Sequence, residues 1–287
     1  MTSKTSYILD TDPWYDPDDL FSLLYLLNSN ATIDLIVTGD EVGTGRAELT
    51  KWFLEEIGMP EIKVVAGAKL PGPTKLFCQD LLPNKLYDVS GNVADEIAKV
   101  VGGSDRTVYM GIQAYSNLDL FQQTHSSLSD KVTLYQMAGS LDPSRKKAEH
   151  NVRIDIPAAK RVMASRIKQY LVMADTTLNP KFEVSNQHPL YNFCRQHSNA
   201  GIRAIAKNID QFNGAIGYWT FMHDPLTVSA ALGHNFVDFY QANVAINDQG
   251  LMKLDDRGSN IFLSKKQSRD DAFMQNFSDT IMRGNYK

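Results

Sequence analysis

The sequence predicts an α/β protein, a single domain over residues 1–287 in which helices flank a largely parallel, mixed sheet. Two observations carry this prediction. Short apolar runs alternate with amphipathic helical segments along most of the 287 residues, and such alternation favours parallel strands joined by right-handed crossovers. The chain also has no internal repeat, low-complexity stretch or linker, and 43% of its residues are hydrophobic, as in ordinary globular domains.

The strands are predicted where runs of apolar and β-branched residues end in polar or glycine-rich loops. Two late runs, at 237–246 and 260–263, predict a hairpin. The first run leads into Asp10, Thr11 and Asp12, so we expect acidic side chains at the carboxyl edge of the sheet, where open α/β sheets bind ligands. In chain order, the runs before the two late ones occupy residues 7–9, 33–38, 62–66, 107–111, 132–137 and 170–174.

Helices are predicted between the strands from the spacing of apolar residues and from capping residues. The first begins at Asp18 and Asp19, directly after Pro17, because carboxylates and proline are favoured in a first turn. Gly58 ends the second as a C-terminal cap, and Pro157 lies in the first turn of a later one. After the first, the helical segments lie at 47–57, 93–101, 118–122, 157–165, between 188 and about 209, 226–232 and 270–282.

Four segments lack a clear period, and we expect them to be loops. Residues 70–92 contain Pro71, Pro73 and Pro83. A loop of this length is usually functional, so we interpret it as a lid over the acidic edge. Glu149 and Asn151 would alternate on one face of a short extended segment. The other irregular segments are the polar stretch 142–155, residues 176–188 and the glycine- and aromatic-rich stretch 212–220.

Charge and composition restrict the expected partners and location. The 29 basic and 33 acidic residues leave a net charge of −4, which argues against nucleic acid or an anionic membrane as a partner. The N-terminus lacks the apolar core of a signal peptide, and no apolar run approaches the ~20 residues of a membrane helix. Cys78 and Cys194 lack metal or redox spacing, so a reduced, cytoplasmic setting is expected.

Five carboxylates fall within ten residues, namely Asp10, Asp12, Asp16, Asp18 and Asp19. Asp10 and Asp12 are two positions apart at a strand end and so point to the same face. Carboxylates this close repel one another unless a cation lies among them, and hard divalent cations take oxygen ligands. A solvated turn with an aspartate N-cap explains one or two of these residues but not five, so their spacing favours a metal site.

Five short motifs resemble those of the inosine–uridine-preferring nucleoside hydrolases. The stretch D-T-D-P-W-Y-D-P-D-D at 10–19 is similar to the longer form of the family's opening motif except at one position. The motifs follow the family order from residue 8 to about 230, and they imply a Rossmann-like nucleoside hydrolase fold. The other four are VVAGA at 64–68 with Pro71 nearby, YMGIQAYSNL at 109–118, AEHNVRIDIPAA at 148–159 and HDP at 223–225.

The resemblance implies cleavage of the N-glycosidic bond of a ribonucleoside, with Ca²⁺ as cofactor. By position, Asp12, Asp19 and Asp224 look like metal ligands, and the backbone carbonyl of Ile112 looks like a fourth. Asp12 also looks like the general base that deprotonates the attacking water. A small-molecule nucleoside is then the partner, nucleoside salvage the setting, and a homodimer or homotetramer the assembly to look for.

Other residues resemble the groups that surround the substrate. Asp18 and Asn151, with Glu149, look like the residues that bind the ribose hydroxyls. Asp10 would orient Asp12 or hold the loop.

The roles of several other residues remain open. Asp16 is the extra acid of the longer motif. His223, beside Asp224, is a candidate acid for the departing base, because histidine titrates near neutral pH; a histidine that only packs or hydrogen-bonds at a helix start is the alternative. Tyr218 and Trp219 could belong to a base pocket or to an ordinary aromatic loop.

The chain departs from the family pattern in the substrate shell. Trp14 replaces a glycine, and its indole could stack on the nucleobase as a substrate contact or could pack in the core. Thr44 and Pro143 stand where asparagines are common, and His150 replaces a phenylalanine. The family's histidine in the lid loop has no counterpart between residues 70 and 92. The metal ligands are therefore better supported by the resemblance than any particular nucleoside.

Two other functions stay open. The substrate-shell departures allow a relative that keeps metal and ribose binding but has lost turnover. The sequence I-L-D-T-D also resembles the nucleophile loop of haloacid dehalogenase-type phosphatases, in which Asp10 would act with Mg²⁺, although this leaves the later motifs unexplained. Arg145, Lys146 and Lys147 are expected to be solvated, and they are the place to look for a phosphate contact if the substrate is a nucleotide.

Overall fold

A nine-stranded mixed sheet runs through the residues that the computed structural model describes, which are 4–29, 31–70 and 75–286. Its strands are β1 (Thr5–Thr11), β2 (Ile33–Thr38), β3 (Val64–Ala66), β4 (Arg106–Gly111), β5 (Val132–Met137), β6 (Lys168–Val172), β9 (Val237–Ile246), β10 (Met252–Leu254) and β11 (Ser259–Ser268). Their order is β10-β9-β11-β6-β5-β4-β1-β2-β3. All neighbours from β11 to β3 are parallel, whereas β9 is antiparallel to β10 and β11.

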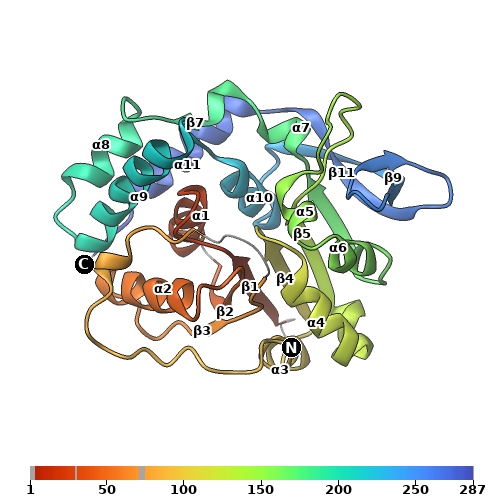
Figure 1. Ribbon diagram of the computed structural model, residues 1–287, viewed down its shortest axis with the longest axis horizontal. Helices are drawn as coiled ribbons and strands as arrows, with labels where there is room; N and C mark the ends of the chain where they lie inside the picture. The colour runs from red at the N-terminus through yellow and green to blue at the C-terminus, as the bar shows by residue number, and fades with distance from the viewer. Residues whose placement is uncertain (1–3, 30, 71–74, 287) are drawn as a thin grey trace.

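Helices pack on both faces of this sheet (Figure 1). They are α1 (Asp18–Leu27), α2 (Gly45–Glu56), α3 (Val93–Gly102), α4 (Ser116–His125), α5 (His150–Ile154), α6 (Ile156–Met163), α7 (Ala174–Thr177), α8 (Pro189–Gln196), α9 (Ala200–Ile216), α10 (His223–Ala231) and α11 (Asp270–Met282). Three 3-10 helices, η1 (Gln79–Leu81), η2 (Ser126–Lys131) and η3 (Pro180–Phe182), and the short antiparallel pair β7 (Glu183–Val184) and β8 (Thr220–Phe221) complete the described elements.

The sheet separates two apolar cores. Leu9 of β1 belongs to the core built with α1, α2 and α8 to α11, while Ile8 belongs to the core built with α3, α4 and α6. Successive side chains of a strand point to opposite faces, so the continuous apolar run of β1 is buried on both sides, as parallel strands require. This confirms the predicted α/β class with a mostly parallel sheet and flanking helices.

The carboxyl ends of β1, β4 and β5 open onto a common edge, and α1 and α10 pack against each other there. In Figure 1 these two helices lie at the centre, with α9 on one side and α5 on the other. The turn from β1 into α1 and the start of α10 are thereby brought together from opposite halves of the chain.

Several predicted elements have the observed bounds, and others differ for local reasons. Strands 33–38 and 132–137 and helix 270–282 agree with β2, β5 and α11. The predicted hairpin is present, but β10 extends it to three strands. Within 70–92 the structure has only η1 among the described residues. Pro71 and Pro73 lie outside the described residues, so the lid stays a prediction.

The prediction that 142–155 is all loop, with Glu149 and Asn151 on an extended face, is wrong. Residues 150–154 form α5, because the Glu149 side chain accepts hydrogen bonds from the backbone N–H groups of Asn151 (3.0 Å) and Val152 (3.3 Å). This is an N-cap, which supplies partners for otherwise unpaired amides. The next helix, α6, is capped in the same way by Asp155.

The segment 212–220 is also more helical than predicted. Helix α9 continues to Ile216, and Gly217 ends it with a φ of +88°, a conformation that glycine adopts without steric cost. Gly214 lies inside the helix, and because glycine is unfavourable in helices, the sequence did not predict this extension.

Candidate active site

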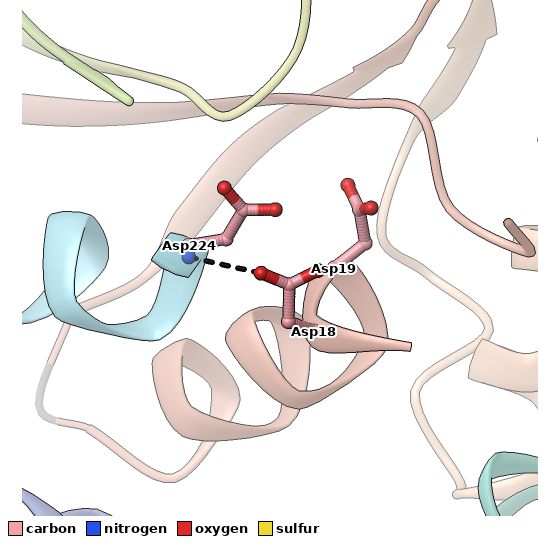
Figure 2. A group of neighbouring side chains, drawn as sticks. All are labelled: Asp18, Asp19 and Asp224. Atoms are coloured by element: carbon pink, nitrogen blue, oxygen red, sulfur yellow. Dashed lines mark hydrogen bonds between the residues drawn. The ribbon is translucent and has the colours of Figure 1, made fainter. Parts of the chain in front are cut away.

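Three carboxylates converge at the carboxyl edge of the sheet (Figure 2). Asp18 and Asp19 come from the first turn of α1, and Asp224 comes from the first turn of α10. All three are buried, and one oxygen of each lies within 4.8 Å of one oxygen of the others. The backbone N–H of Asp224 donates to Asp18 Oδ2 at 3.1 Å. Helix N-termini favour negative charge, so two packed helix starts can hold this acidic trio.

The loop after β1 positions the trio from the strand side. The backbone N–H of Asp12 donates to Asp19 Oδ1 at 3.1 Å, and the Thr11 hydroxyl donates to the same oxygen. Asp12 itself lines the cavity above the trio. The loop and the first turn of α1 therefore fix each other, and they keep Asp12 next to Asp19.

Burial sets the protonation of these carboxylates. It raises the pKa of Asp19 to about 7, and it raises the pKa values of Asp12, Asp18 and Asp224 well above the ordinary range, with further increases from the neighbouring aspartates. Desolvation and like charges both disfavour ionised carboxylates. A divalent cation would remove this penalty, and a cluster of carboxylate oxygens is a donor set that suits a hard cation. The residues present therefore fit a metal ion.

Asp10 does not face the trio but holds the loops beneath it. Its carboxylate accepts hydrogen bonds from Tyr109 Oη (2.6 Å), Gln113 Nε2 (2.6 Å) and Asn117 Nδ2 (2.8 Å). Burial still raises its pKa to about 7. Of the two roles expected for Asp10, these contacts describe the one that holds the loop.

Asp16 lies beside Asp18 of the trio and has an anchor of its own. The hydroxyl of Thr220, in β8, donates to its carboxylate. Burial raises the pKa of Asp16 to about 6. Asp16 thus ties the β1–α1 loop to the segment that precedes α10.

A cavity of about 310 Å³ lies over these acids, a volume in the range of small-molecule sites. Besides Asp12, Asp16 and the trio, its walls include Ile112, Glu149 and Asn151, which were predicted site residues. The other lining residues are Tyr15, Met137, Arg145, His150, Ala174, Leu178, Phe212, Tyr218 and His223. Trp219 is not among them, so only Tyr218 of the predicted aromatic pair lines the cavity.

Backbone groups hold the two predicted ribose contacts in the wall. Glu149 accepts a third hydrogen bond from the backbone N–H of Gly139 at 3.0 Å, and Asn151 Nδ2 donates to the Met137 carbonyl at 2.9 Å. Both side chains are buried. Glu149 is the N-cap of α5 and Asn151 lies in its first turn, and both are anchored to residues at or just after the end of β5.

His223 lines the cavity from the start of α10. Its Nδ1 lies 2.7 Å from the Thr177 hydroxyl, and its ring stacks on Phe221 with centroids 5.8 Å apart. Burial, with a contribution from the charge of Arg145, lowers the pKa of His223 to about 4. The imidazole is therefore neutral at pH 7.

The structure does not bring Trp14 to the cavity. The indole is fully buried, and it packs on Trp52 and Phe53 with ring centroids 6.1 Å and 6.0 Å away. Its backbone has a φ of +72°, a left-handed conformation that favours glycine. The packing alternative therefore describes Trp14, and we do not include it in the site. Thr44 and Pro143 are exposed and likewise do not line the cavity.

Arg46, a residue that no sequence motif indicated, is 1% exposed beneath the acidic loop. Its guanidinium donates to the carbonyls of Asp12 (2.9 Å), Pro13, Asp40 (3.0 Å) and Lys75 (3.0 Å). Its positive charge lowers the pKa of Asp12 against the larger effects of burial and Asp19. An arginine after a glycine-rich loop carries no sequence signal for this role, since its partners lie up to 34 residues away.

The fold and the cavity define an α/β protein with a substrate site at the carboxyl edge of its parallel strands and a buried acidic cluster that can bind a metal. The sequence profile of the inosine-uridine preferring nucleoside hydrolases matches residues 7–277, and the chain belongs to this family. The predicted resemblance is thus confirmed. The chain is an enzyme of the class that acts on N-glycosyl compounds, and the family does not support the phosphatase alternative.

Solved structures of nucleoside hydrolases share this fold. A purine-preferring ribonucleoside hydrolase from Gardnerella vaginalis has a TM-score of 0.80 at 17% identity, over 97% of this chain and 98% of that one. The inosine-uridine preferring nucleoside hydrolase from Bacillus anthracis has a TM-score of 0.79 at 16% identity, over 98% and 100%. A plant nucleoside hydrolase has a TM-score of 0.80 at 15% identity, over 98% and 100%. No curated protein matches the chain.

The lengths and compositions of the helices also bear on membrane insertion. Within the described part of the chain, none combines the length and the apolar character needed to cross a bilayer.

Proposed function

We propose that this protein hydrolyses the N-glycosidic bond of a ribonucleoside with the help of Ca²⁺, releasing nucleobase and ribose. The observation that carries the proposal is the convergence of Asp224 with Asp18 and Asp19 in a buried cavity. Acids more than 200 residues apart would not be packed together in a low-dielectric site without a function that offsets their repulsion.

Asp19, Asp224, Asp12 and the carbonyl of Ile112 are the proposed ligands. Ca²⁺ takes about six to eight oxygens, so water and sugar hydroxyls would complete the set. When bound, the ion would lower the pKa of the attacking water and so supply a nucleophile near neutral pH. Asp18 belongs to the same acidic trio, and we propose that it contacts the ribose hydroxyls next to the ion.

Asp12 is the proposed general base. It lies beside Asp19 at the cavity wall, and its burial makes its carboxylate a better proton acceptor than an exposed one. A positioned base contributes about 10²–10⁴-fold to such a reaction. Asn151 and Glu149 are proposed to hold the sugar from the α5 side while the oxocarbenium-like transition state forms.

His223 is proposed to face the departing base. Because its ring is neutral at pH 7, we propose that it donates a hydrogen bond rather than acting as an imidazolium acid. This requires the tautomer in which the Thr177 hydroxyl donates to Nδ1 and Nε2 carries the proton. His223→Ala should then lower kcat more than it raises KM.

The test is an assay of base release from a panel of purine and pyrimidine ribonucleosides, with Ca²⁺ and with EDTA. Calcium-dependent release of ribose from at least one of them supports the proposal. Ribose binding without any turnover would instead identify the impaired relative that the substrate-shell departures suggest. A cytoplasmic location and a dimeric or tetrameric assembly stay predictions.

A further inference from the structure

Arg145 is the only lysine or arginine among the described residues that line the cavity. It belongs to the loop between β5 and α5, and its side chain is partly buried, whereas Lys146 and Lys147 are exposed. The prediction that this basic run is solvated therefore holds for Lys146 and Lys147 but not for Arg145, which lines the cavity. Six carboxylate side chains line the same cavity, but Arg145 does not contact the buried trio. Neutralising the trio therefore does not explain why this arginine lies in the cavity.

The guanidinium makes no hydrogen bond or ion pair with any residue in the described ranges, unlike Arg46 and Arg161, whose guanidinium groups are bonded to protein oxygens. The acid beside it in the wall, Glu149, is already occupied by three backbone N–H groups. Its charge acts only through space, on the exposed Asp142 and on His223. The donors of Arg145 are therefore available to a ligand.

A second cavity of about 440 Å³ adjoins the first, and the two share Arg145, Ala174 and Leu178 as walls. This second space also carries the amine of Lys266. Arg145 thus stands where a substrate that fills the first cavity would extend into the second. Asp142 and Asp175 also line the second space, but Asp175 accepts hydrogen bonds from Ser140 and Leu141, and Asp142 accepts them from Ser144. The basic side chains at this boundary therefore suit an anionic substituent that projects from the sugar.

The arrangement of the walls indicates which part of the sugar reaches Arg145. The acidic trio would hold the ion and the 2′ and 3′ hydroxyls. The aromatic side chains Tyr15, Phe212 and Tyr218 form an edge-to-face group on the α9 side, and flat bases favour such surfaces. The loop that carries Arg145 leads into α5, and α5 lies on the opposite side of α1 and α10 from α9 (Figure 1). The remaining end of the ribose, C5′, therefore points toward Arg145.

We propose that Arg145 binds a phosphate on C5′, so that the substrate is a nucleoside 5′-monophosphate. A planar guanidinium matches a phosphate in a two-pronged hydrogen bond. This inference rests on the proposed function and keeps its chemistry. Water forms a bond to C1′, the C1′–N bond breaks, the proton taken by Asp12 ends on the departing base, and the phosphate ester stays intact. The products are the free base and ribose 5-phosphate.

The test compares matched pairs, inosine with its 5′-monophosphate and uridine with its 5′-monophosphate, in Ca²⁺. We expect the kcat/KM ratio of nucleotide to nucleoside to exceed about ten for the wild type, and to fall about tenfold or more in Arg145→Gln. Lys146→Gln removes the same charge from the exposed side of the same loop, and it should leave the ratio unchanged. A wild-type preference for the nucleoside, or an equal ratio in both variants, would overturn the inference.

Binding of ribose 5-phosphate and of ribose, measured by calorimetry in Ca²⁺, separates this inference from the proposed function. If no substrate is cleaved but ribose 5-phosphate binds about tenfold more tightly than ribose in an Arg145-dependent way, hydrolysis fails and the phosphate subsite stands. If nucleosides are cleaved and the two sugars bind equally, the subsite fails and the hydrolase stands.

Discussion

The backbone amide and the carboxylate of Asp224 have different partners. The amide donates to Asp18, while the carboxylate faces Asp18 and Asp19 across the cavity. A conservative change at this position therefore alters the charge of the site but leaves the packing contact between α1 and α10 in place. Individual roles in the acidic cluster can be separated by such changes.

Asp12→Ala and Asp224→Ala should each lower base release by at least about 10²-fold, because one removes the proposed base and both remove proposed ligands. Asp16→Ala should be milder, since Asp16 is tied to Thr220 and is proposed neither as base nor as ligand. Steady-state kinetics with a ribonucleoside measures all three. An equal loss in all three variants would contradict the ligand assignment.

Trp14→Gly sets two effects against each other. Glycine would relieve roughly 1–2 kcal/mol of left-handed backbone strain, but losing the fully buried indole should cost about 3–5 kcal/mol. The loss of packing is the larger effect, so the free energy of unfolding of the variant, measured by urea titration, should be about 2 kcal/mol lower than that of the wild type. Unchanged or higher stability would mean that the contacts with Trp52 and Phe53 contribute little.

At the scale of elements, Arg46 joins three segments that have no regular structure of their own. It reaches from the start of α2 to the loop after β1, to the loop that contains Asp40 and to the stretch that contains Lys75. Its bonds go mainly to carbonyl oxygens, which would be left buried and unpaired without it. The acidic loop is therefore held from below by a protein cation and, in our proposal, from above by a metal.

Arg46→Met should lower the free energy of unfolding by about 3–5 kcal/mol, as expected when one member of a buried charged interaction is removed and its partners stay buried. It should also weaken Ca²⁺ binding, because the loop that carries Asp12 loses its anchor. Arg46→Lys keeps the charge and should recover part of the stability. Urea unfolding and calcium titration of both variants check this. If Arg46→Met is as stable as the wild type, the anchoring role is wrong.

Sequence reasoning succeeded for elements whose signal is local and periodic, and failed where a single contact decides. Strand β5 and helix α11 were predicted with their observed bounds, since apolar runs and periodicity define them. Helix α5 is only five residues long and exists through the cap from Glu149. Helix α9 passes through a glycine that sequence rules interpret as a break. Neither outcome follows from periodicity.

At the scale of the whole molecule, the site depends on contacts that no local pattern contains. The acidic run at 10–19 predicted a metal site, and the HDP motif supplied Asp224 only through the family resemblance. Arg46 had no such signal, and the basic run at 145–147 did not indicate which of its side chains lines the cavity, because both depend on where the loops after β2 and β5 come to lie. The acids of the cluster were thus predictable, whereas the placement of the cations around them required the structure.

The buried acids also make stability depend on pH. Burial raises the pKa values of Asp10 and Asp19 to about 7 and of Asp16 to about 6, from an ordinary value of 3.8. A raised folded-state pKa means that the stabilisation is complete below about pH 4 and is lost as pH rises through 6–7. Without Ca²⁺, the melting temperature should therefore decrease from pH 5.5 to pH 8.

Calcium should reverse this trend, because a cation replaces the protons and binds only the folded state. The difference in melting temperature between samples with Ca²⁺ and with EDTA should widen as pH rises. Asp142→Asn, at an exposed acid outside the trio, serves as a control and should behave like the wild type. Parallel curves with and without Ca²⁺ would contradict the linkage.

Calcium binding to the EDTA-treated enzyme, measured by calorimetry on the wild type and on Asp224→Asn, tests the central proposal most directly. The account predicts one Ca²⁺ per chain in the wild type and about 100-fold weaker binding in the folded variant, because Asp224 is the ligand contributed by α10. Equal affinity in the two proteins, or a folded wild type that binds no Ca²⁺, would contradict it.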